Sequence, residues 1–333
     1  MNSIQLSRIF LRLTITTALF TACHSANAQS KKAPANLEQK KLDADAKVKD
    51  FGLWKSDAFS PELKLSSVKG ISNSVADWQI ANPYERPDWD WTEAALWVGM
   101  TLHADITRDK KYFSELERVA RDLKYKLGPQ KGFGDDHAVG QLYLWNFLRN
   151  EHHEEIKETQ DIMAAFVNRP HTESLKWQNR IALREWAWCD SLFMAPPTLT
   201  MLYASTGEKQ YIDMMDQLWW KTYDYLYDSE SDLYFRDSRY FKAKESNGEK
   251  VFWARGNGWV IAGLVNVLRY MPEDYPTRPR YVQLFKEMTN SLKSIQLEDG
   301  SWHASLLDPE AFPSPESSGT AFFGYAFMWG INN

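Results

Sequence analysis

Apolar residues recur at helical spacing along most of the chain from residue 61 onward. Loops rich in glycine, proline and aspartate separate these segments, and the alternating runs that would indicate strands are scarce. The pattern predicts ten helices, at residues 63–80, 91–106, 110–126, 137–149, 153–167, 188–205, 209–226, 256–271, 278–296 and 319–331. It predicts no sheet, so the expected fold class is all-α.

Two junctions between predicted helices resemble each other, at residues 107–112 and 206–211. In each, an aromatic-rich helix ends, a short polar turn follows, and the next helix begins with a tyrosine on its apolar face. Such repetition indicates helical hairpins, which close into a toroid or stack into an open solenoid. Longer loops at residues 130–137, 228–251 and 297–316 precede every second helix and would surround one mouth of a barrel.

The first 28 residues are typical of an export signal. Two arginines precede an apolar run at residues 13–22, and Ala26-Asn27-Ala28 provides a small-residue cleavage site. The run is too short to span a bilayer permanently. The sequence therefore predicts a periplasmic or secreted protein, with an outer-membrane lipoprotein anchored at Cys23 as the alternative.

Residues 29–60 are polar and are predicted to form a leader outside the core, so that residues 61–333 form the folded domain. Removal of the signal would leave Cys189 without a partner for a disulfide, and stability must then come from a packed core. The net charge of −5 gives no overall attraction to nucleic acid or to a membrane surface, so we expect neither as a partner. The sequence does not indicate an oligomeric state.

Asp190 stands at the start of an otherwise apolar predicted helix, in the run Trp-Ala-Trp-Cys-Asp-Ser-Leu-Phe-Met-Ala-Pro-Pro of residues 186–197. A carboxylate in this position can simply cap its helix. Alternatively, Trp186 and Trp188 can hold it in a dry pocket, where a raised pKa would let it donate and accept a proton. The residues alone leave both interpretations open.

Asp135 and Asp136 open another predicted helix, with one acid more than a cap needs. In a third segment, Trp253 and Trp259 flank Arg255, and two glycines allow close backbone approach. The planar guanidinium of Arg255 suits a carboxylate, which belongs either to a ligand or to an internal acid.

The sequence lacks the short motifs that identify common catalytic and phosphate-binding sites. It contains no glycine-rich phosphate loop, no His-Glu-x-x-His zinc helix and no Gly-x-Ser-x-Gly elbow. Its histidines have no metal-ligand spacing. We therefore expect no metal site and no cofactor.

Three blocks together resemble the unsaturated glycuronyl hydrolases of glycoside hydrolase family 105: residues 188–197, residues 252–259, and the Glu-Ser-Ser-Gly-Thr-Ala run of residues 316–321. The likeness includes their order and spacing and covers residues 70–333. It implies an (α/α)6 barrel as the catalytic domain. Because ten helices are fewer than six hairpins contain and the sequence stops inside a predicted helix at Asn333, we expect the last one or two helices to be missing.

The resemblance also implies a mechanism. The enzymes of that family act on the terminal 4,5-unsaturated uronic acid that a polysaccharide lyase leaves. An aspartic acid protonates the C4–C5 double bond and then activates the water that adds at C5, after which the ring opens and the next sugar is released. By motif position this residue is Asp190, with Asp136, or its neighbour Asp135, as the second acid. The implied substrate-binding residues are Asp135, Trp188, Met194, Trp253, Arg255, Trp259 and Arg236.

Within that set, Arg255 would bind the substrate carboxylate. Some members have a histidine after the Leu-Tyr of residues 233–234, where this sequence continues with Phe-Arg-Asp, so the contact of that histidine is absent or is replaced by Arg236. The alternatives are another sugar-active α/α-barrel enzyme, such as an epimerase or a lyase, and a non-catalytic oligosaccharide-binding protein. The base residues that an epimerase or a lyase would need are not evident. The sequence does not indicate whether the uronic acid is of the galacturonic or the glucuronic type, or which sugar follows it.

Overall fold

The computed structural model describes residues 64–178 and 180–333. The predicted signal peptide, the polar leader and Cys23 lie outside these residues. The long helices are α3 (Leu65–Ala81), α4 (Trp91–Thr107), α5 (Lys110–Asp122), α7 (Gly140–Asn150), α8 (Lys157–Val167), α10 (Pro196–Thr206), α11 (Lys209–Leu226), α12 (Ala254–Tyr270), α13 (Arg278–Ser294) and α14 (Ser317–Asn332).

Shorter elements lie between the long helices. They are the helices α6 (Gly134–His137) and α9 (Ser191–Met194), and the 3-10 turns η3 (His153–Glu155), η4 (Ile181–Leu183) and η5 (Pro309–Ala311). Strand β1 (Tyr227–Asp228) pairs antiparallel with β2 (Leu233–Tyr234), with Tyr227 opposite Tyr234.

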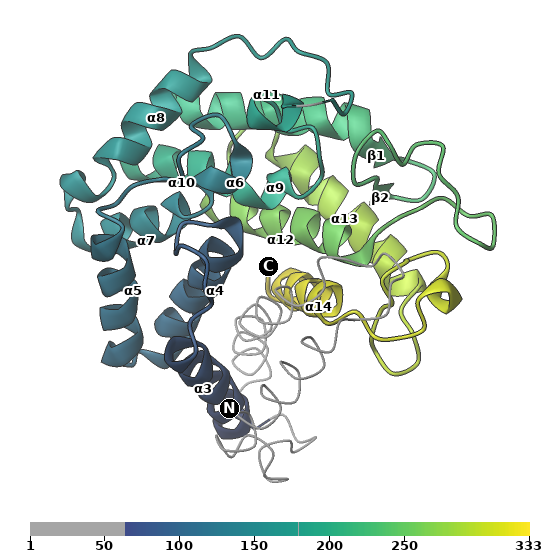
Figure 1. The fold of residues 1–333 in the computed structure, drawn as a ribbon, viewed down its shortest axis with the longest axis horizontal. Helices are drawn as coiled ribbons and strands as arrows, with labels where there is room; N and C mark the ends of the chain where they lie inside the picture. Colours follow the sequence, from purple (N-terminus) through teal and green to yellow (C-terminus); the bar gives the residue numbers. More distant parts are fainter. Residues whose placement is uncertain (1–63, 179) are drawn as a thin grey trace.

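The long helices form an inner and an outer layer that curve around a common centre (Figure 1). Helices α4, α7, α10, α12 and α14 contact one another in that order and form the inner layer of the described part. Helix α5 packs on α4, α11 on α10, and α13 on α12 and α14 from outside. The alternation of inner and outer helices is that of an α/α barrel, which confirms the predicted fold class.

Burial along the helices explains this division. Helix α12 is buried at every residue from Ala254 to Leu268, so all its faces are covered and it belongs in the interior. Helix α5 instead buries one stripe, which consists of Tyr112, Leu116, Val119 and Ala120. Its remaining faces are polar, so it covers the inner layer and borders solvent.

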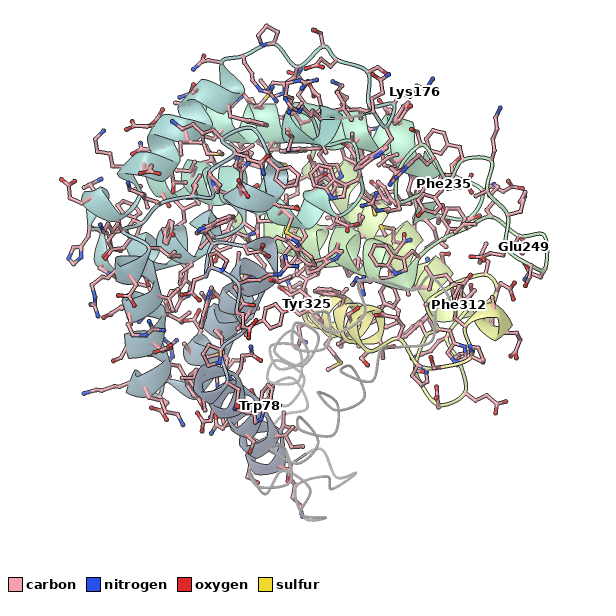
Figure 2. All side chains as sticks on the ribbon, viewed as in Figure 1. Trp78, Lys176, Phe235, Glu249, Phe312 and Tyr325 are labelled. Atoms are coloured by element: carbon pink, nitrogen blue, oxygen red, sulfur yellow. The ribbon has the colours of Figure 1, made fainter. Side chains whose placement is uncertain are left out.

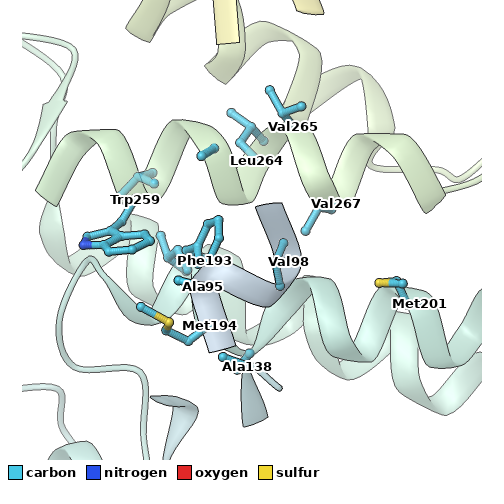
Figure 3. Packing of buried hydrophobic residues seen from close by; sticks show 14 of the residues in the cluster. Ala95, Val98, Ala138, Phe193, Met194, Met201, Trp259, Leu264, Val265 and Val267 are labelled. Carbon is cyan, nitrogen blue, oxygen red and sulfur yellow. The ribbon is translucent and has the colours of Figure 1, made fainter. Parts of the chain in front are cut away.

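Aromatic rings fill the contact between the inner helices. The ring centroid of Trp259 on α12 lies 4.7 Å from that of Phe193 on α9 and 4.6 Å from that of Phe322 on α14. Figure 3 shows Trp259 and Phe193 facing each other, with Met194 and Ala95 nearby. Trp91 meets Trp259 edge-on at 6.0 Å. The abundance of aromatic residues therefore serves helix packing to a large extent.

The structure divides the predicted helix 153–167 into η3 and α8, divides 188–205, and shifts the start of 137–149. The segment 188–205 forms α9 and α10, because Pro196 has no N–H to continue a helix and begins a new one. The predicted helix 137–149 begins as α7 at Gly140, and the separate helix α6 at Gly134–His137 directly precedes it. The β1–β2 hairpin was not predicted, since two-residue strands are too short to show an alternating pattern. No helix of residues 64–178 and 180–333 has both the length and the apolar character to cross a membrane.

Candidate active site

The residues that carry chemistry gather at the N-terminal ends of the inner helices. Asp90 caps α4, Asp135 lies in α6 just ahead of α7, and Asp190 directly precedes α9. Arg255 is in the first turn of α12, and Glu316 caps α14. Because helix N-termini carry partial positive charge, this end of the barrel favours anionic groups.

Helices α6 and α9 bring Asp135 and Asp190 together, although 54 residues lie between them in the sequence. The segment around Gly134 packs directly on this part of the chain, since a Cβ at Gly134 would be in ordinary van der Waals contact with the Trp188 ring at 3.5 Å and the Ser191 Cβ at 3.6 Å. The Gln141 side chain also donates a hydrogen bond to the Phe193 carbonyl oxygen, 3.2 Å away. The two short helices are therefore fixed to each other.

Asp190 makes no capping hydrogen bond to its helix, so the capping interpretation has no support in the geometry. Its Oδ1 instead accepts a hydrogen bond from the buried Cys189 thiol at 3.1 Å. Burial raises the pKa of Asp190, against the opposing effect of Arg236, the Cys189 thiol and Arg255. A partly enclosed carboxyl of this kind can hold a proton and release it at the next step.

Asp135 and Asp136 have different surroundings. Burial, and then the neighbouring charges of Asp190 and Asp136, raise the pKa of Asp135 well above its usual value. The Asp136 side chain faces the other way and accepts a hydrogen bond from the backbone N–H of Gln130. Its carboxyl also fills the space beside Gly128, where a Cβ would lie 2.4 Å from the Asp136 Cγ. The geometry favours Asp135 over Asp136 as the second acid and gives Asp136 a structural role.

Both predicted arginines contribute to the charge around Asp190. Arg255 stacks on Trp253, with 4.3 Å from its Cζ to the ring centroid, and its Nη1 lies 3.9 Å from Glu316 Oε1. The carbonyl oxygen of Arg236 accepts a hydrogen bond from the Cys189 N–H at 2.9 Å, which fixes the Arg236 backbone beside Asp190.

The predicted aromatic and methionine contacts fall into two groups. Trp253 is partly exposed and lies beside Arg255, where a ligand can reach it. Trp188 is buried and stacks on Phe133, while Met194 and Trp259 are only 1% exposed and belong to the core. The burial of Met194 and Trp259 does not support the predicted direct contact with substrate. The two side chains pack in the core and hold α9 and α12 in place.

Two residues near the site escaped the sequence analysis. Glu93 in the first turn of α4 is 3% exposed, and burial together with Asp88 and Asp90 raises its pKa to about 7. Cys189 was considered only as an unpaired cysteine. The one available signal for Glu93 was an acid directly before the apolar run of residues 94–98. Among residues 64–178 and 180–333, no group of three or more acidic, histidine or cysteine side chains is arranged to hold a metal ion.

Comparison with known proteins identifies relatives of this chain. Residues 69–333 match the family described as Glycosyl Hydrolase Family 88. A protein of Alteromonas sp. (strain LOR) named unsaturated 3S-rhamnoglycuronyl hydrolase is 33% identical, over 100% of this chain and 84% of its own length.

Two solved structures are also similar. One is named Polysaccharide Lyase BACCELL_00875, with a TM-score of 0.69, 30% identity and coverage of 78% of this chain and 75% of that one. The other is a glycosyl hydrolase family 88 protein from Bacteroides vulgatus, with a TM-score of 0.68, 28% identity and coverage of 78% and 76%.

Proposed function

The chain belongs to Glycosyl Hydrolase Family 88 and is a glycoside hydrolase, and from that premise we propose how it acts and on what. It removes the 4,5-unsaturated uronic acid from the non-reducing end of lyase-generated oligosaccharides by hydrating the C4–C5 double bond. The observation that carries this proposal is Asp190, which is free of any capping bond, has a raised pKa and lies beside a second carboxyl and two arginines. The name of the Alteromonas relative favours an unsaturated rhamnoglycuronyl oligosaccharide as the substrate.

Asp190 has two tasks in the proposed reaction. The protonated carboxyl first donates its proton to C4, so that positive charge develops at C5 and the ring oxygen. The resulting carboxylate then takes a proton from the water that adds at C5, which restores the acid. The sum is one water molecule added across the double bond, and the hemiketal formed at C5 opens to release the next sugar. Burial and the charge of Asp190 raise the pKa of Asp135 well above its usual value, and in its protonated form it supplies a hydrogen-bond donor beside Asp190.

Arg255 is proposed to bind the carboxylate of the unsaturated sugar. Its present contact with Glu316 is long, at 3.9 Å, and the Glu316 carboxylate also accepts hydrogen bonds from Ser318 and from the backbone of Gly319. Glu316 is thus occupied with capping α14. A guanidinium can form two parallel hydrogen bonds to a carboxylate, and Trp253 supports that of Arg255 from one face.

A lyase is the second candidate, because one similar structure bears that name. The two activities change absorbance in opposite directions. A hydrolase of this kind consumes the unsaturated uronyl chromophore of an unsaturated disaccharide, whereas a lyase creates the chromophore from an intact polysaccharide. We expect a loss of absorbance with the disaccharide and no gain with the polymer. A gain with the polymer and no loss with the disaccharide would establish the lyase.

Two finer assignments belong to the same proposal. The order of the three sequence blocks supports a place close to glycoside hydrolase family 105. Residues 1–28 support export to the periplasm or beyond, with cleavage after Ala28. Mass spectrometry of the mature N-terminus tests the second assignment: a chain that begins at Gln29 supports it, and a lipid-modified Cys23 would support the lipoprotein alternative.

A further inference from the structure

Asp237, which follows β2, is fully buried and accepts hydrogen bonds at both carboxylate oxygens. Its Oδ1 accepts from the Arg239 backbone N–H at 3.0 Å and from Arg239 Nε at 2.9 Å. Its Oδ2 accepts from Arg239 Nη2 at 2.9 Å and from Arg236 Nη1. Arg239 therefore fixes the orientation of the Asp237 carboxylate, and the carboxylate holds the Arg236 guanidinium.

The ring of Trp177 holds the same guanidinium from another side. Arg236 Cζ lies 5.0 Å from the centroid of that ring. Trp177 belongs to a different loop, which is joined to this one by a hydrogen bond of 2.8 Å from the Trp177 N–H to Ser238 Oγ. Figure 2 labels Lys176 and Phe235, the neighbours of Trp177 and Arg236, on the same side of the molecule.

Arg236 is close to the proposed general acid, yet its side chain is bonded to a different carboxylate. Its carbonyl oxygen accepts a hydrogen bond from the N–H of Cys189, the residue before Asp190. Burial raises the pKa of Asp190, and the charge of Arg236 is the largest effect that opposes burial. In the part of the chain that the structure describes, however, no ion pair joins the Arg236 and Asp190 side chains. Arg236 therefore acts on Asp190 through its charge alone.

A direct ion pair with Arg236 would remove the proton that the proposed reaction requires. An arginine at ion-pair distance lowers the pKa of an aspartate by about 1–3. Asp190 would then be a carboxylate before the substrate arrives, although it must first donate a proton and only then accept one. The guanidinium has to be near enough to stabilise the carboxylate that forms, but not so near that it takes away the acid.

We propose that Asp237 is a positioning residue, which holds the Arg236 guanidinium away from Asp190 and so prevents an ion pair that would keep Asp190 deprotonated. This inference rests on the proposed function, which makes Asp190 the general acid. Against the effect of burial, hydrogen bonds from Arg239 and Arg236 lower the pKa of Asp237. Asp237 therefore remains a carboxylate, and keeps its hold on Arg236, while Asp190 gains and loses its proton.

The other groups that act on Asp190 are Asp135 on α6, the Cys189 thiol and Arg255 on α12. None of them is bonded to Asp237, so replacement of Asp237 leaves their contacts in place. Arg236 also opposes the raised pKa of Asp135. Both carboxyls therefore respond in the same direction when the guanidinium moves, and the apparent pKa of the pair reports its position.

The test follows the alkaline limb of kcat/KM for an unsaturated disaccharide in Asp237→Asn and in Arg236→Met. The amide oxygen of asparagine can still accept from the Arg239 backbone N–H, but its NH₂ group then faces Arg236 and cannot accept a hydrogen bond. The freed guanidinium can pair with Asp190, so the limb should move to lower pH by about one pH unit or more. Arg236→Met removes the guanidinium and should move the limb to higher pH.

The double variant Asp237→Asn/Arg236→Met distinguishes two ways in which Asp237 can influence Asp190. If Asp237 acts by holding Arg236, the double variant has the alkaline limb of Arg236→Met. If its limb lies below that of Arg236→Met by as much as Asp237→Asn lies below the wild type, the charge of Asp237 acts on Asp190 directly and the inference is wrong. A limb in Asp237→Asn that is unchanged, or moved to higher pH, would also overturn it.

Asp228→Asn is the matched control. Asp228 lies on β1 of the same hairpin, is partly buried and pairs with Lys250 at 2.8 Å, so its replacement also removes one negative charge and breaks an ion pair. Its alkaline limb should match the wild type, and a shift equal to that of Asp237→Asn would contradict the inference. If Asp237→Asn does not fold, Asp237→Asn/Arg239→Gln, which leaves the net charge unchanged, replaces it and should show the same shift.

A titration without substrate separates this inference from the proposed function. In protein labelled with carbon-13 at the aspartate Cγ atoms, the NMR signal of Asp190 is the one that Asp190→Asn removes. Its midpoint should be lower in Asp237→Asn and higher in Arg236→Met than in the wild type. If the wild type consumes no unsaturated disaccharide, the proposed function fails, and these midpoints still decide whether Asp237 controls Arg236. Identical midpoints in the three proteins would overturn the inference even where turnover is normal.

Discussion

At the scale of single residues, Asp190 is distinguished by what its carboxyl contacts. It stands where an aspartate would cap a helix, yet it accepts a hydrogen bond from the Cys189 thiol and is close to Asp135. The sequence could predict the importance of Asp190, because the surrounding run resembles a known family. It could not divide the roles of Asp135 and Asp136. Adjacent residues of a short helix point in different directions, and that direction depends on the packing of α6 against α9.

Replacement of Asp190 by asparagine tests its role as acid and base. The change keeps the shape and a hydrogen-bonding amide but removes the proton that both half-reactions need. We expect turnover of an unsaturated disaccharide to fall by at least ~10²–10⁴. Circular dichroism and the shift in Tm on ligand binding should remain as in the wild type. Retention of more than about a tenth of the rate would contradict the assignment and direct attention to Asp135.

The pH dependence of kcat/KM tests the surroundings of the same carboxyl. Activity should be highest in mildly acidic to neutral solution and fall as pH rises through the raised pKa of Asp190, because the general acid is then deprotonated. The Cys189 thiol stabilises the carboxylate, so Cys189→Ala should raise this pKa further and move the alkaline limb to higher pH. Cys189→Ser, which keeps a donor, should move it less. An alkaline limb that is identical in all three proteins would show that the thiol does not act on Asp190.

At the scale of the helices, the sequence pattern located most segments but not their internal breaks. Long amphipathic helices such as α5 and α13 carry a periodic signal of their own. The division of 188–205 into α9 and α10 depends on Pro196, and the end of α5 at Asp122 precedes Lys124 and Tyr125, whose φ angles are positive. The break between α9 and α10 matters for function, since the short helix α9 packs against α6 and brings Asp190 close to Asp135.

Two glycines in helices should respond to alanine in opposite ways. A Cβ at Gly263 on α12 would lie 2.1 Å from the Leu192 carbonyl oxygen of α9, so Gly263→Ala should push α9 away and destabilise the protein by ~1–3 kcal/mol. A Cβ at Gly70 on α3 would meet no atom within 4 Å outside its own stretch of helix, so Gly70→Ala should stabilise the protein by ~0.5–1 kcal/mol. Urea unfolding curves measure both. The same sign for the two variants would contradict the close contact between α9 and α12.

Glu93 makes the stability of the α4 N-terminal end dependent on pH. Its pKa is raised to about 7 by burial and by Asp88 and Asp90, so the folded protein binds a proton there more tightly than the unfolded chain does. Stability is therefore lost as pH rises from about 4.5 to about 7, the ordinary and raised values. Glu93→Gln removes this cost, so its Tm should exceed that of the wild type at pH 8 and match it near pH 4. A constant difference in Tm across this range would count against a buried Glu93 carboxyl.

At the scale of the whole molecule, the barrel assembles its site from distant parts of the sequence. Each inner helix of the described part begins at or close to a charged residue of the site, from Asp90 on α4 to Glu316 on α14. The class of the fold could be predicted from the sequence, because the repeated hairpins are local features. The three motif blocks predicted glycoside hydrolase family 105, which is closely related to the Glycosyl Hydrolase Family 88 that the chain matches. The contact of Trp177 with Arg236 and Arg239 could not be predicted from the sequence, because two irregular loops meet there.

This arrangement of helix ends has a consequence for refolding. The hairpins can form from local contacts, whereas the site requires that residues 90, 135, 190, 255 and 316 reach their places together. After dilution from urea, the far-ultraviolet circular dichroism signal should therefore recover faster than hydrolysis of an unsaturated disaccharide. Recovery of both signals with one rate constant would mean that helices and barrel form in a single step. A measurable delay would make activity the last property that the folding chain regains, and the most sensitive indicator that its inner layer is in place.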